Sequence, residues 1–264
     1  MTITELIQAN RLADIKQQYA KSPSLLNPPP NEEYPLITAV RHGRKDIVRW
    51  LLQQAIDVNK KGDENNTALH IAAEEGEPEL AQLLLEHGAD IEAKGAYGRT
   101  PLQSAVMNGR RDESLEVANV LLSAGAKYDL HTAVRLGRTD KVRELLENDS
   151  TAINKAPLPG DLLESAIQAG SGDLVTLLLR HGVSPDVSQS MGRPPIFSAI
   201  EIAVNLGNFD PLLQLLQHGV KTDVFNTHGD SLKEVINLFL SSPQPEPVNE
   251  RIQRVSQMMS KYLH

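Results

Sequence analysis

Residues 65–76 read NNTALHIAAEEG and residues 98–109 read GRTPLQSAVMNG, so one pattern returns after 33 residues. In both segments a threonine precedes a short apolar run that ends at a glycine. The same profile occurs around glycines 43, 137, 170 and 207, and the six glycines are 33, 33, 28, 33 and 37 residues apart. A recurring period of this length predicts a repeat architecture.

Each of these glycines is followed by a second apolar run, as in IVRWLL (residues 47–52) and LAQLLL (residues 80–85). Several of these runs end in a glycine-containing turn such as HGAD (residues 87–90), where glycine can adopt the left-handed conformation that stops a helix. Thr67 and Thr100 stand where a hydroxyl can cap the first helix. Each repeat is therefore predicted to be a helix, a turn, a second helix and a stop.

These segments resemble the ankyrin repeat family, whose 33-residue unit opens its first helix with T-P-L-H-x-A. Residues 65–76 and 98–109 match best, and the resemblance covers about residues 34–240. It implies an all-α, ankyrin-type helix-turn-helix solenoid with short β-turn fingers between the repeats.

The departures from the pattern predict the domain organisation. Residues 1–31 are expected to form an N-terminal capping unit, and residues 241–264 a C-terminal capping helix. Residues 32–240 are expected to form about six repeats, with irregular third, fourth and sixth units. Thr2 with Glu5, and Ser231 with Glu234, have the spacing of a capping box.

The composition excludes several classes of protein. The formal net charge is −8, so binding of nucleic acid through a strongly basic surface is not expected. The chain has no cysteine, which removes disulfides and thiolate chemistry. Residues 1–10 lack the features of an export signal, and no run of 18 apolar residues occurs. We expect a soluble cytoplasmic protein that neither enters nor binds a membrane.

No catalytic or metal-binding constellation is apparent. Most of the eight histidines occupy repeat positions far apart in sequence, which does not suit a metal site. The acidic residues near Glu74 alternate with apolar residues, as on a solvated surface. No phosphate-binding loop, dinucleotide-binding motif or nucleophile elbow is present. We expect no enzyme activity, no cofactor and no metal.

The resemblance implies that the finger tips and the ends of the first helices line a concave binding face. Residues just before the helix-ending glycines and at the tips are the candidates. They are Arg41, His42, Asp63, Glu64, Glu74, Glu75, Tyr97, Arg99, Met107, Asn108 and Arg135. Their mixed charges favour a folded protein partner over a polyanion, and Tyr97 is a candidate anchor at a finger tip.

The predicted function is therefore that of a non-enzymatic protein–protein interaction module, active as a monomer. An alternative is a dedicated inhibitor or immunity-type protein that occludes one enzyme or toxin. A third hypothesis, from a different class, is a catalytic or small-molecule-binding protein. Its pocket would lie between the third and fourth repeats, where the 28-residue spacing leaves almost no room for a finger.

Overall fold

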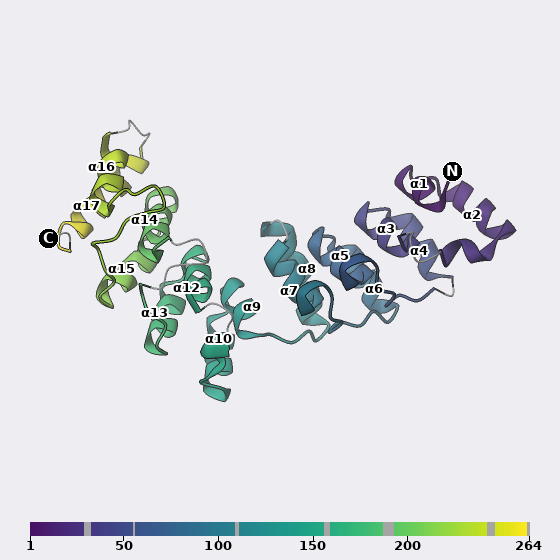
Figure 1. The fold of residues 1–264 in the computed structure, drawn as a ribbon, viewed down its shortest axis with the longest axis horizontal. Coiled ribbons are helices and arrows are strands. Elements are labelled where there is room, and N and C mark those ends of the chain that lie inside the picture. Colours follow the sequence, from purple (N-terminus) through teal and green to yellow (C-terminus); the bar gives the residue numbers. More distant parts are fainter. Residues whose placement is uncertain are drawn as a thin grey trace. The chain divides into compact units, whose positions relative to one another are not determined.

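The computed structural model describes residues 1–28, 33–54, 56–108, 111–155, 159–186, 193–241 and 246–262. Over these ranges the regular structure is helical, and the one β-type pairing described is an isolated antiparallel bridge between Phe225 and Ser231. The chain divides into two compact units, Met1–Lys127 and Tyr128–His264 (Figure 1). Each unit is a stack of helix-turn-helix pairs, which confirms the expected all-α solenoid.

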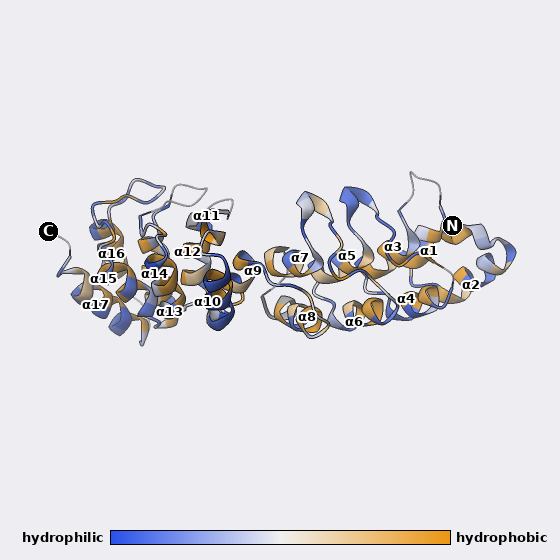
Figure 2. Ribbon diagram, turned by 90° about the horizontal axis from the view of Figure 1, so that it is seen from below, coloured by the Kyte–Doolittle hydropathy of each residue, from blue (hydrophilic) through white to orange (hydrophobic). Residues whose placement is uncertain are grey.

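The first unit contains four helix pairs. They are α1 (Ile3–Gln8) with α2 (Leu12–Lys21), α3 (Pro35–Arg41) with α4 (Lys45–Leu52), α5 (Ala68–Glu74) with α6 (Pro78–Glu86), and α7 (Pro101–Asn108) with α8 (Arg111–Ser123). The first helices α1, α3, α5 and α7 pack in succession, and the second helices α4, α6 and α8 form a parallel row. Figure 2 shows these two layers.

Equivalent residues of successive repeats form the core of the first unit. Leu36, Leu69 and Leu102 lie 33 residues apart and are all buried. Ala72 and Ala105 are completely buried beside them, and their small side chains let neighbouring helices approach closely. The sequence period therefore corresponds directly to one layer of the stack.

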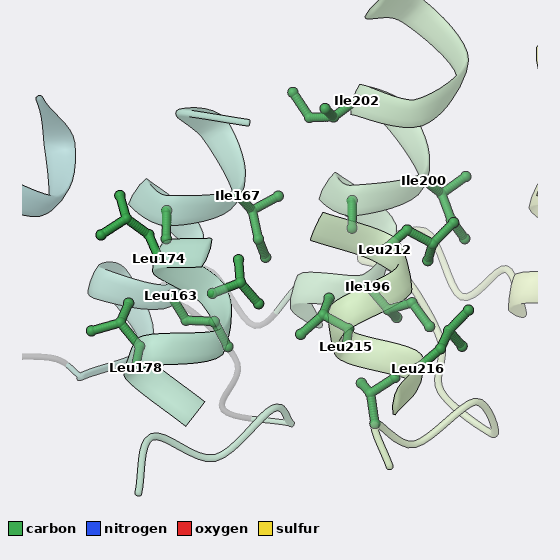
Figure 3. Close-up of a cluster of buried hydrophobic side chains, with 14 of the residues drawn as sticks. Leu163, Ile167, Leu174, Leu178, Ile196, Ile200, Ile202, Leu212, Leu215 and Leu216 are labelled. Atoms are coloured by element: carbon green, nitrogen blue, oxygen red, sulfur yellow. The ribbon is translucent and has the colours of Figure 1, made fainter. Parts of the chain in front are cut away.

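The second unit is built in the same way. Its helices are α9 (Leu130–Arg135), α10 (Thr139–Asn148), the short α11 (Ala152–Lys155), α12 (Pro159–Gln168), α13 (Gly172–Arg180), α14 (Pro195–Leu206), α15 (Asp210–Gln217), α16 (Leu232–Ser241) and α17 (Val248–Met259). The first helices α9, α12 and α14 stack on one another, as do the second helices α10, α13 and α15. Figure 3 shows leucine and isoleucine side chains of α12–α13 and α14–α15 gathered in this core.

Local capping explains where the helices begin and end. The Thr2 hydroxyl accepts the Glu5 amide at 3.2 Å while the Glu5 carboxylate accepts the Thr2 amide at 3.0 Å, which confirms the predicted capping box. Ser231 and Glu234 form the second predicted box. Gly76 follows α5 with φ of +71°, a conformation that glycine adopts without the cost that a side chain imposes.

The C-terminal end departs from the regular stack. Helix α14 has 12 residues where α5 has 7, which agrees with the 37-residue spacing that ends at Gly207. Helix α17 packs against both α14 and α16. The Arg251 guanidinium of α17 donates to the carbonyl of Asn205 at 2.8 Å, so it caps the end of α14. The long first helix thus serves as the support for the last helix of the chain.

Candidate functional site

Two short turns project from the first unit, one before α5 and one before α7 (Figure 2). The Gly62 amide closes one turn by donating to the Asn66 carbonyl at 2.9 Å. The Gly95 amide closes the other by donating to the Arg99 carbonyl, also at 2.9 Å. We call these turns the 62–66 finger and the 95–99 finger.

The tips of the two fingers have the same backbone conformation but carry different side chains. Glu64 and Tyr97 lie 33 residues apart, and both adopt left-handed backbone conformations, with φ of 58° and 54°. This conformation costs a non-glycine residue about 1 kcal/mol or more, and it persists where the surrounding structure enforces it. The Tyr97 side chain is 90% exposed, and the Arg99 guanidinium lies 5.1 Å from its ring centroid.

Side chains of the preceding repeat hold the 95–99 finger in place. The Asn66 side-chain oxygen accepts the Ala96 amide at 2.9 Å, and the His70 Nε2 donates to the Arg99 carbonyl at 3.0 Å. A Cβ atom at Gly95 would lie 2.3 Å from the Asn66 oxygen and 2.7 Å from His70 Nε2. The finger is therefore pre-ordered by contacts that leave room only for glycine.

His70 joins the finger to the start of α5. Its side chain is fully buried, and its Nδ1 accepts the Thr67 amide at 3.2 Å in a capping box. Burial lowers the pKa of His70 below its ordinary value, and the charges of Lys61 and Lys94 lower it further. His70 is consequently neutral and acts as a structural link.

Glu74 also has structural contacts, although the sequence placed it on the partner surface. Its side chain is half-buried, and its Oε1 accepts the Ser104 hydroxyl at 3.1 Å and the Asn66 amide nitrogen at 3.4 Å. Glu74 thus connects α5, α7 and the finger support. Glu75, the next residue, is exposed.

The candidate residues on α3 are similarly engaged. The Arg41 guanidinium donates to the Glu33 carboxylate at 3.0 and 3.1 Å, and the Thr38 hydroxyl donates to the other Glu33 oxygen at 2.8 Å. His42 Nδ1 lies 3.0 Å from the Thr38 carbonyl. The charge of Arg41 is therefore matched within the protein.

The remaining candidates lie at the expected ends of turns and helices. Asp63 is exposed on the 62–66 finger, and Met107 is 39% exposed near the end of α7. Asn108 ends α7, and its side chain lies outside the described residues. Arg135 ends α9 and is exposed, but it belongs to the second unit. All candidates except Arg135 are thus carried by the first unit.

Sequence reasoning missed four residues that shape this surface: Lys61, Asn66, Lys94 and Ser104. Lys61 and Lys94 could have been noticed, because they recur at the repeat spacing of 33 residues. The Lys61 ammonium donates to the Lys94 carbonyl at 2.8 Å, so it reaches from one finger stem to the next. Asn66 and Ser104 carry no comparable signal, since their roles depend on packing between repeats.

The described ranges contain no group of three or more His, Asp or Glu side chains placed to hold a metal ion. An open hollow of about 560 Å³ is lined by Tyr128, Gly137, Arg138, Thr139, Asp140, Lys141 and Glu144 of the second unit. No helix in the described part of the chain has the length and apolar character needed to cross a bilayer.

The match to a protein-family model agrees with the repeat pattern. A family model described as "Ankyrin repeats (3 copies)" matches residues 3–95 and 63–131. The ankyrin repeat domain of human ASB11 is 28% identical, with 83% of this chain and 96% of that chain covered and a TM-score of 0.49. The ankyrin repeat domain of Bcl-3, a member of the IkappaB family, is 20% identical, with 96% and 98% covered and a TM-score of 0.46.

No curated protein sequence matches the chain significantly. The likeness to ankyrin repeats therefore rests on the repeats themselves and on the family model. The match covers residues 3–131, and this part of the chain consists of ankyrin repeats.

Proposed function

We propose that this chain is a non-enzymatic protein-binding module whose first unit contacts one protein partner through its fingers and the ends of its first helices. Ankyrin repeat domains are generally protein–protein interaction modules and are typically not enzymes. The observation that carries the proposal is Tyr97, an aromatic side chain that is 90% exposed on a pre-ordered turn.

An exposed aromatic side chain on a rigid support is well suited to be a binding anchor. Tyrosine offers a large contact area and loses little conformational entropy on binding. Here the backbone of the 95–99 finger is already fixed by Asn66 and His70, so little further ordering is needed. The cost of holding Tyr97 at positive φ is consistent with a residue kept for binding rather than for stability.

We also propose that residues 1–31 and 241–264 cap the array of residues 32–240, and that the protein acts as a cytoplasmic monomer. The capping box at Thr2 and the packing of α17 on α14 support the caps. A dedicated inhibitor would use the same surface, and its hallmark would be loss of the partner's activity in a one-to-one complex.

The test is affinity capture from the cells that produce the protein, using the intact chain, Tyr97→Ala and Tyr262→Ala. Tyr262 is an exposed tyrosine of the second unit whose only described hydrogen bonds use its backbone, so it is a matched control. We expect Tyr97→Ala to weaken binding by about 2 kcal/mol, or about 30-fold, at unchanged thermal stability. Undiminished capture by Tyr97→Ala would refute the proposal, and loss of folding would show that Tyr97 is structural.

A further inference from the structure

Positive charge is concentrated at the 95–99 finger, although the chain as a whole has a net charge of −8. Lys94 and Arg99 belong to the finger and its stem. Lys61 is a third cation at the same place, because its ammonium donates to the Lys94 carbonyl at 2.8 Å. The 95–99 finger and its stem thus carry three cationic side chains, and the Arg99 guanidinium lies over the exposed Tyr97 ring.

These three cations form no salt bridge in the part of the chain that the structure describes. Within the described ranges, no carboxylate oxygen lies within 4.0 Å of the charged groups of Lys61, Lys94 or Arg99. Arg41 and Lys45 of the same unit differ, because each pairs with a glutamate. A surface cluster of unpaired like charges raises the local potential and favours ligands of opposite charge.

Arg99 is held in a defined position in the finger. Its carbonyl accepts hydrogen bonds from the Gly95 amide and from His70, which hold its backbone on both sides of the finger. Its guanidinium lies over the Tyr97 ring at 5.1 Å from the centroid. A planar guanidinium held in this way can donate two parallel hydrogen bonds to a carboxylate.

The neighbouring finger limits where an acidic ligand can lie. Asp63 and Glu64 are exposed at the tip of the 62–66 finger, and Glu64 occupies the position that Tyr97 has in the next repeat. Carboxylates there repel a negatively charged segment. The attractive surface is therefore confined to the 95–99 finger and its stem.

We propose that the 95–99 finger binds an acidic segment of the protein partner, with aspartate or glutamate carboxylates facing Lys61, Lys94 and Arg99 beside the Tyr97 ring. This inference rests on the proposed function, since it names the chemistry of the partner at the same surface. It also assigns Glu64 a role in specificity, because its charge excludes the acidic segment from the adjacent finger.

The test is a titration of the isotope-labelled full chain with a ten-residue polyglutamate peptide, followed by NMR, with polylysine of the same length for comparison. We expect polyglutamate to shift the amide signals of Lys61, Lys94, Tyr97 and Arg99, with affinity falling as salt is added. Absence of these shifts, or equal shifts with polylysine, would overturn the inference.

Charge-reversal variants make the test specific to the finger. Lys94→Glu is expected to weaken polyglutamate binding at least about tenfold, because it replaces attraction by repulsion. Lys233→Glu makes the same change of charge at an exposed site on α16 and is expected to leave binding unaltered. Glu64→Lys is expected to strengthen binding. Equal affinities for Lys94→Glu and Lys233→Glu would contradict the inference.

The same variants separate this inference from the proposed function. If the captured partner is lost with Tyr97→Ala but retained in full by Lys94→Glu, the binding module stands and the acidic segment is refuted. If polyglutamate binds the finger but capture does not depend on Tyr97, the proposed function fails while the charge preference of the finger stands.

Discussion

Replacing Gly95 by alanine tests whether the 95–99 finger is held by the preceding repeat. Gly95 has a negative φ of −100°, so the strain of a left-handed backbone does not enter. The new methyl group would lie 2.3 Å from the Asn66 side-chain oxygen and 2.7 Å from two atoms of the His70 ring. Both side chains must move, and each movement breaks a hydrogen bond to the finger.

The structure gives the size of the effect. Two lost hydrogen bonds at about 1 kcal/mol each, together with about 1 kcal/mol of overpacking, predict a loss of about 3 kcal/mol in the free energy of unfolding. Gly98→Ala is the matched control in the same finger. Gly98 has φ of +71° but open space around a Cβ atom, so only about 1 kcal/mol of backbone strain is expected.

Urea unfolding followed by circular dichroism measures both variants against the intact protein. The prediction is that Gly95→Ala lowers the free energy of unfolding by clearly more than Gly98→Ala. If Gly95→Ala cost no more than Gly98→Ala, the close approach of Asn66 and His70 to the finger would be wrong, and with it the claim that the finger is pre-ordered.

Three further predictions concern stability. Burial lowers the pKa of His70 from its ordinary 6.5, so the folded protein binds fewer protons than the unfolded chain. The stability that neutral His70 contributes is therefore complete above about pH 6.5. It is lost as the pH falls towards the lowered pKa. Urea unfolding at about pH 7.5 and 5.5 should show this loss, and His70→Gln should reduce it, because Gln103 already forms the equivalent capping box without titrating. An unchanged pH dependence in His70→Gln would exclude His70 as the source. Leu69→Ala should lower the free energy of unfolding by about 2 to 5 kcal/mol, since Leu69 is fully buried between repeats, and a neutral result in urea unfolding would contradict the repeat register. Arg251→Ala should destabilise the protein by about 1 kcal/mol in thermal unfolding, because it removes the hydrogen bond that caps α14. Arg180→Ala, at an exposed residue that ends α13, should have little effect. Equal losses of stability in the two variants would contradict the capping role of Arg251.

Most of the fold was predictable because the information is local and repeated. The apolar runs, the capping residues and the helix-ending glycines each act within a few residues, and their recurrence every 33 residues gave the stack. The exposure of Tyr97 followed from its place at a finger tip. Helix α17 was expected at the C-terminus, but its packing against α14 was not, because that contact depends on the shape of the last repeat.

The site was predicted less completely, for a physical reason. A glutamate at the end of a helix, such as Glu74, looks solvent-exposed in sequence. Only the packing of α5 beside α7 brings Glu74 to the Ser104 hydroxyl and the Asn66 amide. The positive charge of the 95–99 finger was missed for the same reason. Lys61 precedes the 62–66 finger in sequence, but its ammonium reaches the stem of the 95–99 finger.

The most direct test of the central claim is to place a photo-crosslinking amino acid at position 97 and, in a second sample, at position 262. Both positions carry exposed tyrosines, so neither change should disturb the core. The account predicts that position 97 crosslinks to one protein partner in the producing cells and that position 262 does not. Crosslinking of the partner from position 262 but not from position 97 would contradict it.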